Sequence, residues 1–393
     1  MKRIQKYAAL VLVTVGTVAF GQIPSSQSTR AKSSSSPVAY VYVSSSPSSG
    51  TSQINAYSAS SSGALTPVPG SPFNVGSEGI SQMAVNGKYL FGSANYTDIY
   101  SFSIASDGAL QQLSLINATS YNPYDDGGPG SVFLDHTGAT LYDDDIYAYG
   151  TGDSAYQAFS IDQSTGQLNF LQLGPDGGVN ANVPLSFIAN NLYAYGASCY
   201  EGSGNIFGYK RNSDGTLTAL NINPIIPAAP KGEGAYCPYL TAADPNGNLA
   251  VSMEPNNDIT PSGPVQIAVY SANSAGNLTT TSTAQNMPKT QAGPTYGIND
   301  IWMSPSGKLL AVAGTSGLQV FHWNSAKPVT TYTGLLTTAP ISQMFWDNDN
   351  HLYALSQTTG KLYVFTVTPT SHSQAKGSPY TITGAENIQV LPE

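Results

Sequence analysis

A short pattern of apolar and aromatic residues recurs along the chain, with an apolar residue three positions before an aromatic one. Ile267 and Tyr270 form one such copy. The seven copies begin at Ile54, Ile99, Tyr156, Ile206, Ile267, Leu318 and Leu362. Successive copies start 44 to 61 residues apart. Such a spacing is typical of a repeat array in which each unit buries its apolar face against a neighbour.

The residues around each copy recur as well. Alternating segments such as Leu192–Tyr195 and Leu309–Val312 lie before copies of the pattern. After five of the copies comes a glycine with a leucine two positions later, namely Gly63, Gly108, Gly166, Gly215 and Gly276. Each glycine predicts a turn that opens another short strand. Four strands in each of seven units predict an all-β chain, a seven-bladed β-propeller of four-stranded antiparallel blades.

The two ends of the array complement each other. The first unit has only three predicted strands, over Ala39–Ser44, Gln53–Ser58 and Leu65–Phe73, and lacks its innermost strand. A spare strand, Glu386–Leu391, follows the complete seventh unit. Pairing this strand with the N-terminal blade closes the ring and removes exposed sheet edges. The sequence therefore predicts one propeller domain over residues 38–393, closed by its C-terminal strand. The six other blades are expected near residues 80–116, 130–173, 185–223, 239–285, 300–336 and 343–382.

Residues 1–21 have the features of a secretory signal peptide. Lys2, Arg3 and Lys6 precede an uncharged, mostly apolar run, and Ala19 and Gly21 supply small residues before a cut ahead of residue 22. The run is too short for a comfortable membrane span, although a retained N-terminal anchor is the alternative. The Ser-rich residues 22–37 are expected to be a flexible linker. We therefore expect a secreted or periplasmic protein with no transmembrane segment in the mature chain.

The low and negative charge narrows the range of partners. Charged residues make up 9% of the chain, and cleavage before residue 22 leaves a net charge of −12. Such a charge disfavours nucleic acids and anionic membrane surfaces as partners. No helical periodicity of useful length and no second domain are visible. We expect a monomer.

The two cysteines predict one disulfide. Cys199 follows the second strand of the fourth unit, and Cys237 lies just before the first strand of the fifth. Both connections lie on the same face of a propeller, at neighbouring blades. In an oxidising compartment this placement predicts a Cys199–Cys237 bridge, with two unpaired thiols as the alternative.

The repeat also resembles a known family, the seven-bladed lactonase propellers of the 6-phosphogluconolactonase-like group. The resemblance is carried by the turns Asp244–Gly247 and Ser304–Gly307, by Leu-Tyr second strands and Ile-x-x-Tyr third strands, and by the segment Leu65–Phe73. It is spread over residues 38–393 rather than concentrated in one motif. It implies the fold and, less specifically, hydrolysis of a sugar lactone, because a shared fold does not carry function with it.

Most of the catalytic pattern that this resemblance implies is missing. The family pattern has a His at the start of the third blade, an Arg-His pair at the start of the fourth and an Asp-x-His in the fifth. Here Gly130, Leu185 and Tyr239 stand near those starts without such neighbours, and only Glu201 matches, at the end of the fourth blade's second strand. Lactone hydrolysis needs an activated water and a group that stabilises the oxyanion. Two hypotheses therefore remain: a recognition module, which we favour, and a lactonase that uses Glu201.

The tyrosines are expected to gather on one face. Connections between blades and loops between second and third strands emerge on the same side of a propeller. The candidate ligand-binding residues in or beside these connections are Tyr124, Asp125, Asp126, Tyr200, Tyr236, Tyr239, Tyr296, Asn299 and Asp300. Tyrosine with amide and carboxyl groups suits a sugar, a lactone, a glycan or a protein partner. Ordinary packing of the loops over the blades is the alternative.

Metal and histidine chemistry have weaker support. Asp125 and Asp126 with the acidic run Asp143–Asp145 form an oxygen-rich region that could hold Ca²⁺. Its spacing matches no known calcium loop, and a solvated acidic rim is the preferred interpretation. We expect no other cofactor. The four histidines, at positions 136, 322, 351 and 372, form no recognisable catalytic triad or zinc spacing.

Overall fold

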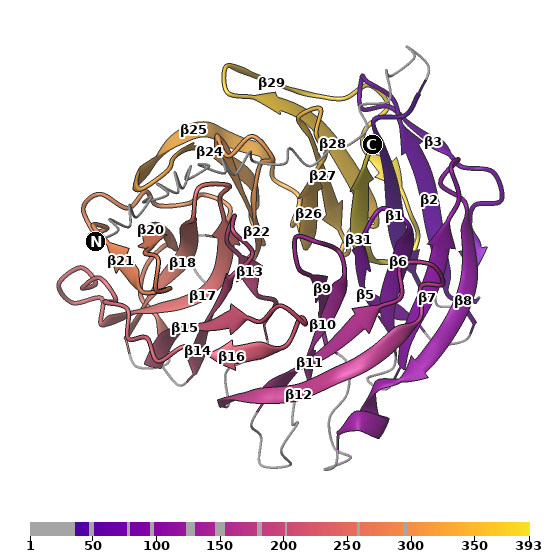
Figure 1. The fold of residues 1–393 in the computed structure, drawn as a ribbon. Helices are drawn as coiled ribbons and strands as arrows, with labels where there is room; N and C mark the ends of the chain where they lie inside the picture. The colour runs from indigo at the N-terminus through magenta and orange to yellow at the C-terminus, as the bar shows by residue number, and fades with distance from the viewer. Residues whose placement is uncertain are drawn as a thin grey trace, which may run out of the picture. The chain divides into compact units, whose positions relative to one another are not determined.

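Seven antiparallel sheets form a closed ring of blades, as the sequence predicted (Figure 1). The computed structural model describes residues 36–46, 51–76, 79–94, 98–122, 130–145, 154–178, 183–200, 203–257, 260–293 and 297–393. Residues 37–393 form one compact unit. The expected signal peptide and nearly all of the expected linker lie outside the described residues and stay predictions. No helix within the described ranges has the length and apolar character needed to cross a membrane.

The blades are listed here from the innermost strand outwards. Blade one contains β31 (Ala385–Pro392), β1 (Ala39–Ser45), β2 (Gln53–Ala59), β3 (Leu65–Pro67) and β4 (Phe73–Asn74). Blade two contains β5 (Ile80–Val85), β6 (Tyr89–Ala94), β7 (Asp98–Ile104) and β8 (Leu110–Asn117), followed by the short 3-10 helix η1 (Ala118–Tyr121). Blade three contains β9 (Val132–Leu134), β10 (Thr140–Asp145), β11 (Ser154–Ile161) and β12 (Leu168–Gly178).

The remaining four blades repeat this order. Blade four contains β13 (Ser186–Phe187), β14 (Tyr193–Tyr200), β15 (Ser203–Arg211) and β16 (Leu217–Ala219). Blade five contains β17 (Ala235–Ala243), β18 (Asn248–Asn257), β19 (Thr260–Pro261), β20 (Gln266–Ala272) and β21 (Leu278–Thr280). Blade six contains β22 (Ile298–Met303), β23 (Leu309–Gly314), β24 (Gly317–Asn324) and β25 (Lys327–Thr337). Blade seven contains β26 (Gln343–Trp346), β27 (His351–Ser356), β28 (Lys361–Thr368), β29 (Ser371–Gln374) and β30 (Tyr380–Thr381).

The ring closes through the C-terminal strand, which confirms the prediction from the strand count. β31 pairs antiparallel with β1, with Val390 opposite Val41 and Ile388 opposite Val43. The side chains of this closing strand also pack against blade seven, because Ile388 and Val390 share a buried cluster with Leu355 of that blade. The last strand of the chain therefore joins blade one to blade seven both by backbone pairing and by apolar contact.

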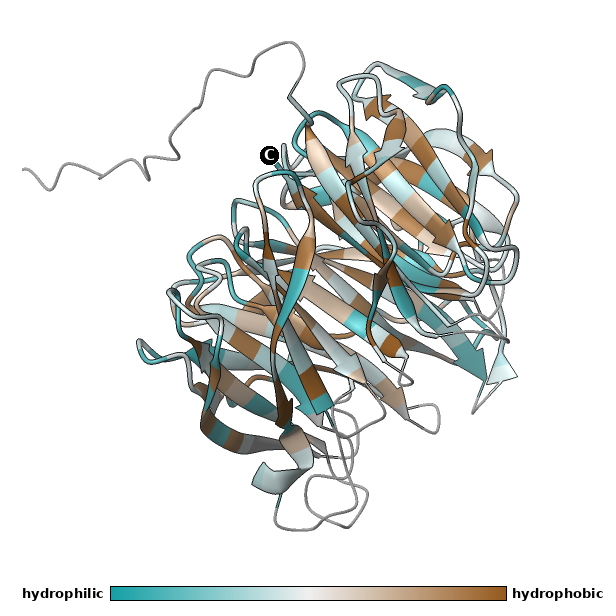
Figure 2. Cartoon of the chain, turned by 90° about the vertical axis from the view of Figure 1, so that its right-hand side faces the viewer, coloured by the Kyte–Doolittle hydropathy of each residue, from teal (hydrophilic) through white to brown (hydrophobic). Residues whose placement is uncertain are grey.

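The core is divided among the blade interfaces. The described residues form seven buried apolar clusters, one for each pair of neighbouring blades. The cluster between blades six and seven, for example, contains Leu309, Val320, Leu352 and Phe365. Hydrophobic residues concentrate along the strands, and the connecting loops are mostly hydrophilic (Figure 2). Each blade is thus stabilised by its two neighbours, which is the physical basis of the repeat in the sequence.

A recurring polar contact between blades explains the tyrosines of the second strands and the glycine turns. The hydroxyls of Tyr42, Tyr142 and Tyr195 each donate to a glycine carbonyl in the turn between the third and fourth strands of the next blade. The acceptors are the carbonyls of Gly108, Gly215 and Gly276, at 3.1, 2.6 and 2.8 Å. These glycines have φ values of 84°, 95° and 81°, which favour glycine. Part of the tyrosine surplus is therefore explained by hydrogen bonds between blades.

Candidate functional site

A cavity of about 940 Å³ lies at the centre of the ring. We call it the central cavity, and residues from the innermost strands or the adjoining segments of all seven blades line it. Side chains that alternate along these strands face either the cavity or the neighbouring blade. Innermost strands of a propeller thus place a circle of side chains around one space, which makes the central cavity the candidate site.

Four successive blades carry an amide or carboxyl side chain at the same position of the innermost strand. These residues are Asp300 in β22, Gln343 in β26, Asn387 in β31 and Gln82 in β5. In each blade this residue pairs with the equivalent residue of the second strand. Asp300 pairs with Ala313, Gln343 with Leu355, Asn387 with Ser44 and Gln82 with Ser93. We call them the polar ladder.

The polar ladder bonds each blade to the next. The Asp300 carboxylate accepts a hydrogen bond from the backbone N–H of Met344 at 2.9 Å. The Gln343 amide oxygen accepts one from the N–H of Ile388 at 3.0 Å. The Asn387 amide donates to Gln343 and Gln82, at 2.7 and 2.8 Å. The ladder thus holds the innermost strands of blades six, seven, one and two in register around the cavity.

Asp300 is the only carboxyl among the described residues that line the cavity. Its side chain is half-buried, and burial raises its pKa to about 7 although hydrogen bonds with Met344, Ile301 and the Trp302 side chain act in the opposite direction. A carboxyl with such a pKa exchanges protons near neutral pH. The residue can therefore accept a proton at pH 8 and donate one at pH 6.

Two other residues that the sequence singled out lie beside Asp300. Asn299 lines the cavity, and its amide donates to the carbonyl of Ile341 in the next blade at 2.7 Å. Tyr239 lines the cavity from blade five, with its hydroxyl near the backbone of Ile298 in blade six. Burial raises the pKa of this tyrosine, so that its hydroxyl stays protonated. The structure thus brings Tyr239, Asn299 and Asp300 together where blades five and six meet.

Tyr236, the fourth described candidate, lies away from this group. Its side chain is buried, and its hydroxyl donates to the side-chain oxygen of Gln266. The Gln266 amide in turn donates to the carbonyls of Ala284 and Met287. Tyr236 is thus part of the packing of blade five, and it does not line the central cavity.

Several candidates fall outside the described residues. These are Glu201, which the lactonase hypothesis requires, and Tyr124, Asp125, Asp126 and Tyr296. Tyr200 ends strand β14, and its side chain is likewise outside the description. Their roles stay predictions.

An aromatic pair in the cavity wall was missed by sequence reasoning. Trp302 in β22 is 39% exposed and lines the cavity. The ring of Phe345 in the neighbouring blade lies 4.5 Å from it, centroid to centroid. A repeated motif could have pointed to this region, because Ile80–Met83, Ile298–Ile301 and Ile341–Met344 all read apolar-polar-polar-apolar. The third residue of each copy, namely Gln82, Asp300 or Gln343, lines the cavity.

The acidic run of blade three has backbone partners. Asp143 accepts from the N–H of Gly130 at 2.8 Å, and Asp144 accepts from the N–H of Ser131. Both carboxyls are buried and hold the chain where it enters β9. Within the described ranges, no three His, Cys, Asp or Glu residues are placed to hold a metal ion. Asp125 and Asp126 lie outside these ranges, and the calcium hypothesis stays a prediction.

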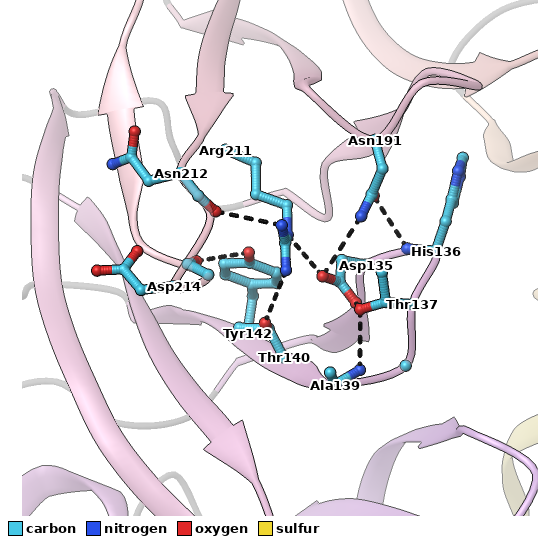
Figure 3. A network of polar contacts seen from close by, with 12 residues as sticks. Asp135, His136, Thr137, Ala139, Thr140, Tyr142, Asn191, Arg211, Asn212 and Asp214 are labelled. Carbon is cyan, nitrogen blue, oxygen red and sulfur yellow. Dashed lines mark hydrogen bonds and ion pairs between the residues drawn. The ribbon is translucent and has the colours of Figure 1, made fainter. Parts of the chain in front are cut away.

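Two of the four histidines, His351 and His136, lie in or beside the turns after innermost strands. His351 is buried, and its Nδ1 lies 2.7 Å from the Asp347 carboxylate, which also accepts from the Tyr353 hydroxyl. His136 occupies the turn after β9 and also lines the central cavity. Its neighbour Asp135 forms an ion pair with Arg211 of blade four, within the network of Figure 3.

The predicted disulfide is present and joins blades four and five. Cys199 of β14 and Cys237 of β17 are bonded, with their Cα atoms 5.3 Å apart. Cys237 lies within the innermost strand rather than just before it, because β17 begins at Ala235. The bond thus connects a second strand to the innermost strand of the next blade, close to Tyr239.

Replacing both cysteines by serine should lower the free energy of unfolding by about 4 kcal/mol, because the bond closes a 38-residue loop in the unfolded chain. Urea unfolding of the variant and of the unreduced protein measures this difference. Reduced wild-type protein serves as the matched control and should unfold like the variant. Equal stability of oxidised and reduced wild-type protein would contradict the prediction.

Comparisons with solved structures support the fold. A candidate 6-phosphogluconolactonase from Bacteroides fragilis matches with a TM-score of 0.64 and 16% identity, over 92% of this chain and 99% of that chain. The periplasmic gluconolactonase of Pseudomonas aeruginosa matches with a TM-score of 0.62 and 14% identity, over 90% and 99%. A protein from Lactobacillus plantarum gives a TM-score of 0.62 at 13% identity, over 90% and 99%. No protein-family model and no curated protein matches the chain. The likeness to lactonase propellers is confirmed for the fold, and at such low identity it shows the fold alone.

Proposed function

We propose that this protein recognises a small, neutral, polyhydroxylated ligand, a sugar or a sugar lactone, in its central cavity. The observation that carries the proposal is the exposed indole of Trp302 against Phe345 in a largely apolar wall that also carries amide and hydroxyl groups. Large aromatic side chains give contact area to the apolar face of a sugar ring. Amide groups both donate and accept, which suits a ring of hydroxyls.

The polar groups of the wall support a ligand of this class. Gln82, Gln343 and Gln389 come from three neighbouring blades, and Ser186 and Thr241 come from two others. Ligand sites in proteins typically combine apolar walls with a few placed polar groups. The cavity volume of about 940 Å³ is large enough for a monosaccharide with bound water.

The charge of the wall favours an unphosphorylated ligand. The described residues that line the cavity include no Lys and no Arg. Their titratable side chains are those of His136, Tyr239 and Asp300. Phosphate groups are typically bound by Arg, Lys or helix N-termini. A neutral sugar lactone therefore fits this cavity better than a sugar phosphate.

Export is part of the same proposal. The N-terminal segment has the features of a signal peptide, and the Cys199–Cys237 bond is typical of an oxidising compartment. One structural neighbour is a periplasmic gluconolactonase. A protein outside the cytoplasm would meet free sugars and lactones rather than phosphorylated intermediates.

Tryptophan fluorescence tests the binding site. Trp302 is 39% exposed, whereas Trp323 and Trp346 are each 5% exposed, so a ligand in the cavity should change mainly the Trp302 signal. We expect saturable changes with D-glucose or glucono-δ-lactone, and no tighter binding of 6-phosphogluconate. Trp302→Leu should weaken the binding measured by calorimetry about fivefold, since an aromatic contact is worth roughly 1 kcal/mol.

The control is Leu115→Ala, at a side chain that is 47% exposed on the outer strand β8. This variant should bind like the unmodified protein. Unchanged affinity in Trp302→Leu, or binding that Leu115→Ala reduces equally, would contradict the proposed site. Binding of 6-phosphogluconate alone would contradict the proposed ligand class.

A further inference from the structure

We infer that Asp300 is a catalytic base, and that the protein hydrolyses the neutral sugar lactone that it binds. This inference rests on the proposed function, because it requires the lactone to bind in the central cavity. It assigns the reaction to a residue of blade six rather than to Glu201 of blade four.

The polar ladder carries the argument, because its structural task does not need a carboxyl. In blade seven the amide oxygen of Gln343 accepts the N–H of the next innermost strand at 3.0 Å. In blade six the carboxylate of Asp300 accepts the equivalent N–H, that of Met344, at 2.9 Å. Blades one and two also carry amides, Asn387 and Gln82. An amide at position 300 would thus complete the ladder, and the carboxyl adds what an amide lacks, the ability to take up a proton.

The location of the carboxyl suits this role. Asp300 is the one carboxyl among the described residues of the cavity wall, and it stands two positions before Trp302 in β22, on the same face of the strand. A sugar ring held against the exposed indole would therefore have its edge next to this carboxyl. General bases act within hydrogen-bond reach of the proton that they remove, directly or through one water.

The reaction needs only the lactone and water. The Asp300 carboxylate takes a proton from a water molecule while the water oxygen forms a bond to the lactone carbonyl carbon. The bond between that carbon and the ring oxygen then breaks, and the ring oxygen receives the proton from the Asp300 carboxyl. The product is the open-chain sugar acid, and Asp300 returns to its ionised form.

The pH dependence follows from the surroundings of Asp300. Burial raises the pKa of Asp300 to about 7, so the active carboxylate is lost as the pH falls below that value. The strands that pack against β22 are β17, β23 and β26. Strand β17 carries two titratable residues, Tyr236 and Tyr239, and burial raises the pKa of both. Strands β23 and β26 carry no titratable residue. In the described structure, Asp300 is therefore the group on these strands that titrates near neutral pH.

The test compares the full-length mature protein with Asp300→Asn. The amide of this variant can still accept the N–H of Met344, as Gln343 does for Ile388. Acid release from glucono-δ-lactone, measured above the buffer rate, should fall at least 100-fold at pH 7.5, the usual contribution of a general base. The Trp302 fluorescence change should keep its midpoint within about threefold, because binding contacts remain. Asp214→Asn, an exposed turn residue with the same change of charge, should keep full activity.

The pH profile provides a readout that needs no variant. The kcat/KM of the unmodified protein should rise with pH through an inflection near 7, and Asp300→Asn should show no inflection there. Lactone binding without hydrolysis above buffer would overturn this inference and leave the proposed function standing. Neither binding nor hydrolysis would overturn both. Full activity in Asp300→Asn, or a flat profile between pH 5.5 and 8, would show that Asp300 is not the base.

Discussion

Removing residues 385–393 should abolish cooperative folding. These residues contain the whole of β31, which pairs with β1 along its length. The deletion also removes the buried side chains of Ile388, Val390 and Leu391, each worth roughly 2 kcal/mol or more, and with them the ladder residue Asn387. Together these losses approach the 5–15 kcal/mol by which a typical domain is stable. The exposed edge of β1 should then drive aggregation.

Circular dichroism melts and gel filtration measure the effect. A synthetic peptide of residues 385–393 serves as the matched control, since an added strand can replace a missing one in an open sheet. The peptide should restore a cooperative melt to the truncated protein. A truncated chain that melts like the full chain without peptide would show that β31 does not hold the ring closed.

Arg211→Met should destabilise the protein by about 4 kcal/mol, the usual effect of breaking a buried ion pair. The Arg211 side chain is 13% exposed, and its Nε lies 2.5 Å from the carboxylate of Asp135, which is fully buried. Arg211 also donates to Thr140 and to the carbonyl of Asn212, so that it connects turns of blades three and four (Figure 3). Methionine leaves the buried carboxylate without its cation.

Urea unfolding at pH 7 measures this loss. Lys210→Met removes the exposed neighbouring cation and should change stability by less than about 0.5 kcal/mol. Adding Asp135→Asn to Arg211→Met should recover part of the loss, because the uncompensated charge disappears. If Arg211→Met and Lys210→Met were equally stable, the ion pair would not stabilise the joint between these blades.

The sequence predicts the fold well because the fold is built from repeated local features. The Ile267–Tyr270 pattern, the glycine turns and the spare C-terminal strand each predict a structural element that is present. The disulfide follows from the same geometry, because blade order places Cys199 and Cys237 on adjacent blades. Most strand boundaries differ by a few residues from the predicted ones, as at β17, but the predicted strand Leu65–Phe73 is two short strands, β3 and β4.

The site is harder to predict because the side chains of an innermost strand alternate between the cavity and the blade interface, and the sequence does not tell the two sides apart. Along an innermost strand, every second side chain faces the cavity and the others face the next blade, so Trp302 looks like a core residue in the sequence. The surplus of tyrosine is ambiguous because many tyrosines resemble ligand-binding residues in the sequence but have structural contacts. Tyr42, Tyr142 and Tyr195 join neighbouring blades, and Tyr236 packs inside blade five. Of the described ligand-binding candidates, Tyr239, Asn299 and Asp300 lie in the cavity wall.

The central claim is that a neutral sugar lactone binds in the central cavity against Trp302. A crystal structure with the δ-lactam analogue of gluconolactone, which resists hydrolysis, tests it most directly. We predict one molecule in the cavity, with its ring over the indole of Trp302 and its carbonyl group near Asp300. A cavity without the analogue at saturating concentration, or the analogue bound elsewhere on the propeller, would contradict this account.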